Sequence, residues 1–187
     1  MNGRTDVAAL RAFSVSLCRA AGLLADDAAL LTDSILFAEC RGVTSHGLLR
    51  LPQYIARLCS GATAKNVPMP FTMEYGGTAR LDAQNGLGQL AGRKAADKAE
   101  ELAGKYGVSF VAVANSNHFG TGAWYAIPAA RRGFFAFNLS SAASAMAPHG
   151  AAQPLLGTDP LGLALPRGEG KAPLALDMAL STVARGK

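Results

Sequence analysis

Apolar side chains recur every three or four positions between residues 7 and 21, and this period predicts an amphipathic helix. Thr5 or Asp6 can cap the start of that helix, and Gly22 can end it. The first sixty residues are therefore expected to form a compact helical unit. The same spacing predicts two more helices, over residues 26–42 and roughly 48–58.

The pattern changes after residues 62–70, which contain two prolines, have no clear period and predict a loop. Residues 71–75 and 78–82 are short strand-like runs around Gly76-Gly77, an arrangement that predicts a β-hairpin. An alanine-rich amphipathic stretch then predicts a helix over about 87–106.

Strand and helix signals alternate along the rest of the chain. Residues 108–114 are rich in β-branched and aromatic side chains, as in a buried strand, and a helix follows over about 123–132. Further short strands are expected at 134–140, 161–165 and 174–176. The alternation predicts an α/β layer.

Composition describes a globular chain with an unremarkable surface. Half of the residues are apolar, 17% are charged and the formal net charge is +5. The basic residues are spread out, with no run longer than pairs such as Arg131-Arg132. Nucleic-acid binding needs a basic stripe or a recognisable motif, so no nucleic-acid partner is expected. The positive charge fits either a solvated surface or attraction of anionic ligands.

Three cysteines, at positions 18, 40 and 59, form no CxxC pair. An odd number without such spacing argues against a disulfide framework and for a reducing, cytoplasmic setting. The N-terminus has no apolar signal-peptide core. No apolar run approaches the roughly 20 residues of a membrane span, so no membrane partner is expected.

The strongest candidate site lies around His46 and Arg50, between the second and third predicted helices. The first of these helices stops near Gly42, so His46 is expected at or near the N-terminus of the next. That position disfavours the imidazolium, and a neutral ring can exchange a proton with a carbonyl or hydroxyl oxygen. Arg50, four residues on, can face the same side and bind a carboxylate.

A proton donor beside a carboxylate ligand is what the reduction of a 2-oxo acid requires. The same spacing also fits a loop histidine packed between two helices, with Arg50 on the surface. Spacing alone favours this structural alternative over a catalytic pair.

A second candidate is the loop around His118, which follows a predicted strand. Gly120 and Gly122 resemble a nucleotide loop, but Tyr125 stands where the dinucleotide fingerprint needs a third small residue. A Rossmann domain is therefore not expected. His118 is either a second active-site group or a loop histidine bonded to backbone.

Metal and hydrolase chemistry lack motifs in this chain. The three histidines are far apart and form no HxxxH or HExxH pair, so no metal site is expected. Ser45 adjoins His46, but neighbouring side chains rarely adopt nucleophile–base geometry, and no GxSxG elbow occurs.

Five motifs in order closely resemble the malate/L-lactate dehydrogenase family that is unrelated to the Rossmann-type lactate dehydrogenases. They are AECRGVTSHGLLRLPQY at 38–54, NHFG at 117–120, LGTDP at 156–160, DMALS at 177–181 and VARGK at 183–187. The resemblance covers nearly the whole chain.

The resemblance implies hydride transfer between NAD or NADP and a small 2-oxo or 2-hydroxy acid such as malate or lactate, in a homodimer. It implies a mixed α/β fold, with a helical substrate and dimerisation unit at 1–66 and a mixed-sheet, non-Rossmann NAD(P)-binding domain from 67 to 187. His46 becomes the proton donor or acceptor, assisted by Ser45. Arg50 becomes the carboxylate ligand, and His118 lines the same pocket.

On the cofactor side, the resemblance implies contacts from two segments. The chain departs from the family pattern there, with Asp159 for the usual Asn, Ala142 in a stretch that is commonly Thr-Asn-Ser/Thr, and Ala151 for a usual glycine. Cofactor preference is therefore not fixed by the motifs. The implied cofactor contacts are Ser140, Ser141, Asp177, Met178, Ala179 and Ser181.

Family members are roughly twice as long as this chain, whose last residues fall inside a motif. We therefore expect an N-terminal part of such an enzyme, weakly active or inactive by itself. The alternative is a catalytically inactive remnant that binds a partner chain or a small acid.

Overall fold

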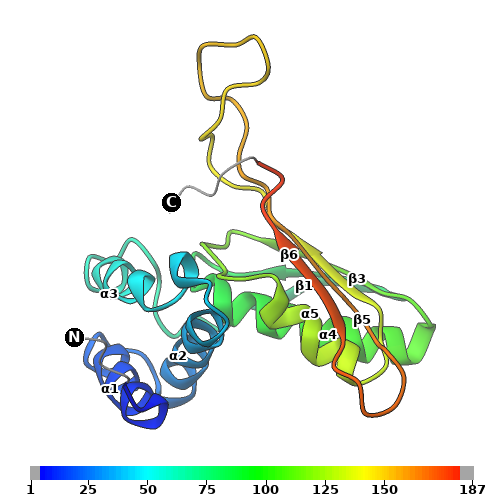
Figure 1. The fold of residues 1–187 in the computed structure, drawn as a ribbon, viewed down its shortest axis with the longest axis horizontal. Coiled ribbons are helices and arrows are strands. Elements are labelled where there is room, and N and C mark those ends of the chain that lie inside the picture. The colour runs from blue at the N-terminus through cyan, green and yellow to red at the C-terminus, as the bar shows by residue number, and fades with distance from the viewer. Residues whose placement is uncertain (1–4, 182–187) are drawn as a thin grey trace. The chain divides into compact units, whose positions relative to one another are not determined.

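The computed structural model describes residues 5–181 of the chain. Contacts divide it into two compact units, between Gly120 and Thr121. The first unit holds the N-terminal helices and a three-stranded sheet in the order β1-β2-β3. The second holds another three-stranded sheet in the order β4-β5-β6 (Figure 1). The mixed α/β class is confirmed.

Three helices open the first unit, as predicted: α1 (Val7–Ala20), α2 (Ala25–Cys40) and α3 (Leu51–Cys59). Asp6 caps α1, because its carboxylate accepts the backbone N–H groups of Ala8 and Ala9 at 3.2 Å. The apolar faces of the helices meet in one core. Its fully buried members include Leu31, Ile35 and Leu58.

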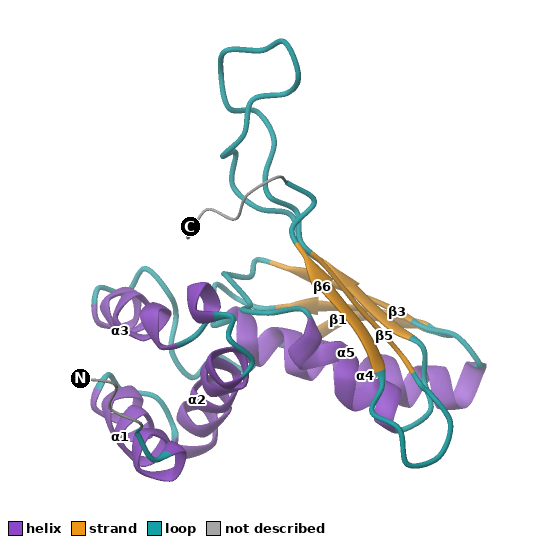
Figure 2. Ribbon diagram, in the orientation of Figure 1, coloured by secondary structure: helices purple, strands orange, loops and turns teal. Residues whose placement is uncertain are grey.

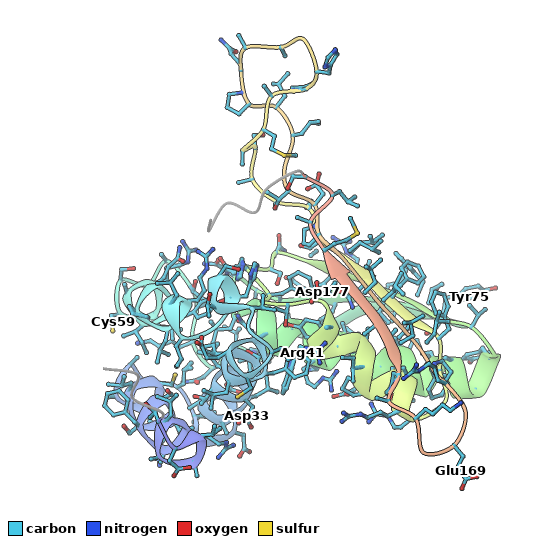
Figure 3. The ribbon with its side chains drawn as sticks, viewed as in Figure 1. Asp33, Arg41, Cys59, Tyr75, Glu169 and Asp177 are labelled. Atoms are coloured by element: carbon cyan, nitrogen blue, oxygen red, sulfur yellow. The ribbon has the colours of Figure 1, made fainter. Side chains whose placement is uncertain are left out.

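The first sheet contains the predicted hairpin and one strand added by a helical crossover. Its elements are β1 (Phe71–Tyr75), β2 (Thr78–Asp82), α4 (Gly88–Tyr106) and β3 (Phe110–Ala114). β1 pairs antiparallel with β2, and β3 pairs parallel with β2. Leu81 of β2 packs with Ala91 and Ala95 of α4, so the helix covers one face of this sheet. Tyr75 lies at the turn end of the hairpin, labelled in Figure 3.

The second unit is an antiparallel sheet with one helix on it. Its elements are α5 (Ala123–Arg131), β4 (Ala136–Leu139), β5 (Leu161–Leu165) and β6 (Leu174–Met178). Gly122, just before α5, lies so close to Gly162 of β5 that a Cβ on Gly162 would come within 2.6 Å of the Cα of Gly122. The long loop between β4 and β5 extends away from the end of the sheet (Figure 2).

The face of this sheet away from α5 is apolar. Register places Phe137, Leu163 and Leu176 in one row across the three strands. Phe137 is 55% exposed and Leu176 is 43% exposed. The sheet therefore presents a band of accessible apolar side chains, which is unusual for a protein surface.

The strands on either side of α5 do not share a sheet. Strand–helix–strand alternation suggested a single layer, but β3 and β4, which flank α5, belong to different sheets. Periodicity identifies an element, whereas pairing depends on contacts that are distant in sequence. Only the β1-β2-β3 sheet is mixed. The domain division at residues 66 and 67 stays a prediction.

Candidate active site

The segment between α2 and α3 does not form the helix N-terminus expected at His46. It makes two single 3-10 turns, Thr44–His46 and Leu48–Arg50, and α3 begins only at Leu51. Pro52 stands in the first turn of α3, where proline is readily accommodated and favours a helix start. The helix-dipole argument for His46 is therefore wrong, since this residue closes a three-residue turn.

Gly47 joins the two turns and lets the chain pass close over α2. A Cβ at this position would lie 3.1 Å from the Cα of Glu39 and closer still to the Glu39 carboxylate. That carboxylate accepts the backbone N–H of Leu48 at 2.8 Å. Glu39, to which the sequence analysis gave no role, thus fixes the loop that carries His46.

Ser45, His46 and Arg50 form a connected, half-buried group. The Ser45 hydroxyl lies 3.0 Å from Nδ1 of His46. Arg50 donates from Nε to the carbonyl oxygen of Ser45 at 2.7 Å and from Nη1 to Oε1 of Gln53 at 3.0 Å. Arg50 is held near His46 by this backbone contact and not by a shared helical turn.

The Arg50 guanidinium has no acidic partner within residues 5–181, where no ion pair involves it. A guanidinium carries five N–H donors. In Arg50, only Nε and Nη1 donate to the protein contacts given above. A half-buried guanidinium in this state suits a carboxylate ligand.

Asn117 anchors the loop that carries His118. Its side-chain amide donates to the carbonyl oxygen of Asn85 at 2.9 Å and accepts from Nη2 of Arg57 at 2.8 Å. Gly88, at the start of α4, lies directly against this loop, because a Cβ there would be 2.7 Å from the carbonyl carbon of His118. The absence of a side chain at Gly88 therefore helps to place His118.

His118 lies between His46 and Tyr54. The rings of His46 and His118 stack with their centroids 5.4 Å apart, and the Tyr54 hydroxyl lies 2.6 Å from Nδ1 of His118. Tyr54 is buried, at 5% exposure, on α3. Tyr54 was not predicted as a site residue, although it stands four residues after Arg50 in the same motif. The structure thus gathers all four predicted catalytic residues and adds Tyr54.

Two pKa values in this group depart from their ordinary ranges. Burial raises the pKa of Tyr54 to about 12, against opposing effects of the Gln89 amide and the Arg50 guanidinium. Burial of the ring lowers the pKa of His118, with further contributions from His46 and Arg50. The His118 side chain is exposed to solvent, which limits the effect of burial on its pKa. The two pKa shifts favour a protonated phenol on Tyr54 and a neutral imidazole on His118.

The predicted cofactor residues gather at one end of the β4-β5-β6 sheet. Leu139 ends β4, Met178 ends β6, and both lie opposite Leu161 of β5. Residues 140–141 and 179–181 continue from these strand ends. Strand register therefore brings together two segments that are far apart in sequence.

Asp177 also has a structural contact within this unit. Its Oδ2 accepts the backbone N–H of Ala123, the first residue of α5, at 2.8 Å, and a negative charge at a helix N-terminus is stabilising. Nearby, Asn138 donates from Nδ2 to the carbonyl oxygen of Gly122 at 3.0 Å. Its Oδ1 is buried and finds no hydrogen-bond partner among the described residues. The role of Asp177 as a cofactor contact stays a prediction.

Asp159, where the family pattern has Asn, keeps a defined contact in its loop. Its Oδ1 accepts the backbone N–H of Ala142 at 2.9 Å. The φ angle of Asp159 is 34°, in a region that Asn and Asp enter more readily than other side chains. Asparagine offers an equivalent oxygen, so this departure preserves the loop contact.

Within residues 5–181, no group of three or more His, Cys, Asp or Glu side chains is placed to hold a metal ion. No helix in this part of the chain is both long and apolar enough to cross a membrane. Cys18, Cys40 and Cys59 are all free thiols.

Comparison with known proteins agrees with the motifs. The profile of the malate/L-lactate dehydrogenase family matches residues 5–187. Malate dehydrogenase from Pyrococcus abyssi is 38% identical over 178 residues, which are 95% of this chain and 49% of that relative. The (2R)-3-sulfolactate dehydrogenase (NADP(+)) from Chromohalobacter salexigens is 38% identical over 174 residues, which are 93% of this chain and 52% of the relative.

Comparison with a solved structure agrees with the family match. Malate dehydrogenase from Pyrococcus horikoshii OT3 superposes with a TM-score of 0.92 at 32% identity, over 99% of this chain and 55% of that one. This chain spans about half the length of the curated relatives it matches. The match to the profile nevertheless covers more than half of the chain itself, and the chain belongs to the malate/L-lactate dehydrogenase family.

Proposed function

We propose that this protein takes part in hydride transfer between NADH or NADPH and a small 2-oxo or 2-hydroxy acid. The observation that carries the proposal is the gathering of His46 and Arg50 from one segment and His118 from another into one group. Family membership supports the reaction class and suggests malate or lactate as the acid, and the names of two relatives support malate or sulfolactate.

We assign His46 to proton exchange with the oxygen of the reacting carbon. Imidazole titrates near neutrality and can therefore both give and take a proton. The Ser45 hydroxyl engages Nδ1 of this ring at 3.0 Å. Ser45 can thereby fix the ring orientation and direct the exchange to Nε2.

We assign Arg50 to the carboxylate of the acid. Its guanidinium is already oriented by Ser45 and Gln53 and faces no acidic side chain in the described chain. Hydrogen bonds to a charged partner contribute about 1.5–3 kcal/mol each. Arg50 therefore provides both affinity and orientation for an acidic substrate.

The cofactor side of the proposal lies in the second unit. Ser140, Ser141 and residues 179–181 share one end of the sheet, so polar groups from two chain segments lie together there. These residues fit a dinucleotide, which when bound supplies the hydride. Asp177, Met178 and Ser181 complete the proposed contacts.

The proposal includes a cytoplasmic homodimer, for which the sequence motifs and the free thiols are the support. The competing reading is a catalytically inactive protein that binds a small acid or a partner chain. The departures at Ala142 and Asp159 favoured it, but the contact between these two residues removes much of that argument.

Oxidation of NADH and NADPH with a panel of 2-oxo acids tests the proposal. His46→Ala should lower kcat by roughly 100- to 10,000-fold, the usual contribution of a general acid. His149→Ala is the matched control, because His149 is exposed on the loop between β4 and β5. Turnover that survives His46→Ala would remove His46 from the reaction. No turnover with any acid, and no rise in melting temperature with either nucleotide, would favour the inactive alternative.

A further inference from the structure

The contact between Tyr54 and His118 assigns different tasks to the two histidines of the site. The two residues lie 64 positions apart in sequence, yet their polar atoms approach to 2.6 Å. Tyr54 is almost fully buried on α3, so its hydroxyl has a fixed position. His118 also stacks on His46, with an interplanar angle of 24°. Its ring is thus held on one face and at one nitrogen.

The direction of the hydrogen bond follows from the neighbours of Nδ1. The backbone N–H of Gly120 also points at Nδ1 of His118, at 3.4 Å. An N–H group can only donate, so Nδ1 is an acceptor, and Tyr54 must then be the donor.

We propose that Tyr54 is a positioning residue that holds His118 as the neutral tautomer with its proton on Nε2. His118 then presents a fixed N–H donor to an oxygen of the acid, while His46 carries out the proton exchange. The donor role rests on the function proposed above, whereas the tautomer itself depends only on the contacts of Nδ1.

The charged and titratable groups around His118 agree with this assignment. Arg50 and His46 are its cationic or potentially cationic neighbours, and Tyr54 is its titratable hydrogen-bond partner. Positive charge on the first two opposes a second proton on His118, and the pKa of Tyr54, about 12, keeps the phenol a donor throughout the neutral range. A neutral ring does not compete with His46 for the transferred proton.

Imidazole ¹⁵N NMR of the labelled 187-residue chain tests the tautomer directly. The chain has only three histidines, so single substitutions assign every ring, and exposed His149 serves as an internal reference. We expect His118 to show an unprotonated Nδ1 and a protonated Nε2 across pH 6–8. Tyr54→Phe keeps the ring and removes the hydroxyl. It should produce a tautomer mixture and raise the pKa of His118 by about one unit, the equivalent of one lost neutral hydrogen bond.

Tyr75→Phe is the matched control, since Tyr75 is 84% exposed at the hairpin turn and should leave His118 unchanged. A protonated Nδ1 in the unmodified chain would overturn the proposal, as would a His118 spectrum that Tyr54→Phe does not alter. Titration with malate tests the donor role of His118 separately from its tautomer. An Nε2 resonance that does not respond to malate would overturn the donor role, while the tautomer measurement would stand without any turnover.

Discussion

Gly88→Ala tests how the fold places His118. The added Cβ would lie 2.7 Å from the carbonyl carbon of His118 and nearer still to the carbonyl oxygens of Asn117 and His118. These are backbone atoms, and Asn117 ties them to Asn85, so they cannot move aside cheaply. Overpacking of this kind costs about 1–3 kcal/mol. For a chain of this size, each kcal/mol lowers the melting temperature by about 2–4 °C.

Gly104→Ala is a control on the same helix with the opposite expected sign. No atom lies within 4 Å of the position of its Cβ, and alanine in a helix interior is more stable than glycine by about 0.5–1 kcal/mol. Urea denaturation and thermal melting measure both variants, and ¹⁵N NMR reports the His118 ring in each. Gly88→Ala should destabilise the chain and shift the His118 signals, whereas Gly104→Ala should do neither. Equal stability of the two variants, with His118 unchanged, would refute the packing argument.

Three further predictions concern other parts of the chain. The hydrogen bond from Asn115 holds the pKa of Asp82 below its usual value of 3.8. The ionised Asp82 carboxylate therefore contributes fully to the free energy of unfolding above pH 3.8, and this contribution is lost as the pH falls through the folded-state pKa. Asp82→Asn should flatten the acid limb of a plot of stability against pH. Asp177→Ala should lower the unfolding free energy by about 1 kcal/mol, because the Ala123 N–H loses its acceptor, and an unchanged urea midpoint would contradict this. Phe137→Lys should reduce the fluorescence of the apolar dye ANS, because it interrupts the exposed band on the β4-β5-β6 sheet; equal dye binding would show that this band is not the accessible apolar surface.

Local signals predicted the elements of the fold well. Asp6 caps α1 because a short acidic side chain reaches the first free N–H groups, and this needs no distant contact. Gly76-Gly77 makes the hairpin turn for an equally local reason, because glycine readily adopts the positive φ angles of tight hairpin turns. Sheet membership was harder, because β4 could pair with several strands and its partner β5 lies beyond a long loop.

In the candidate site, too, local features could be predicted and long-range contacts could not. The motif placed His46 and Arg50 together correctly, although it predicted a helix start where two 3-10 turns occur. The Tyr54–His118 hydrogen bond joins residues 64 positions apart, and no sequence pattern predicts it. The close contact of Gly88 with the His118 loop is likewise visible only in three dimensions. Residue types could be predicted, whereas orientations depended on packing between distant segments.

The most direct test of the central claim compares an acid with its uncharged analogue. We assign Arg50 to the substrate carboxylate, so Arg50→Gln should lower kcat/KM for pyruvate by about 10- to 150-fold, the equivalent of one charge-assisted hydrogen bond. The same variant should leave kcat/KM for pyruvamide nearly unchanged, because that substrate offers no carboxylate. Equal losses on both substrates would contradict the account.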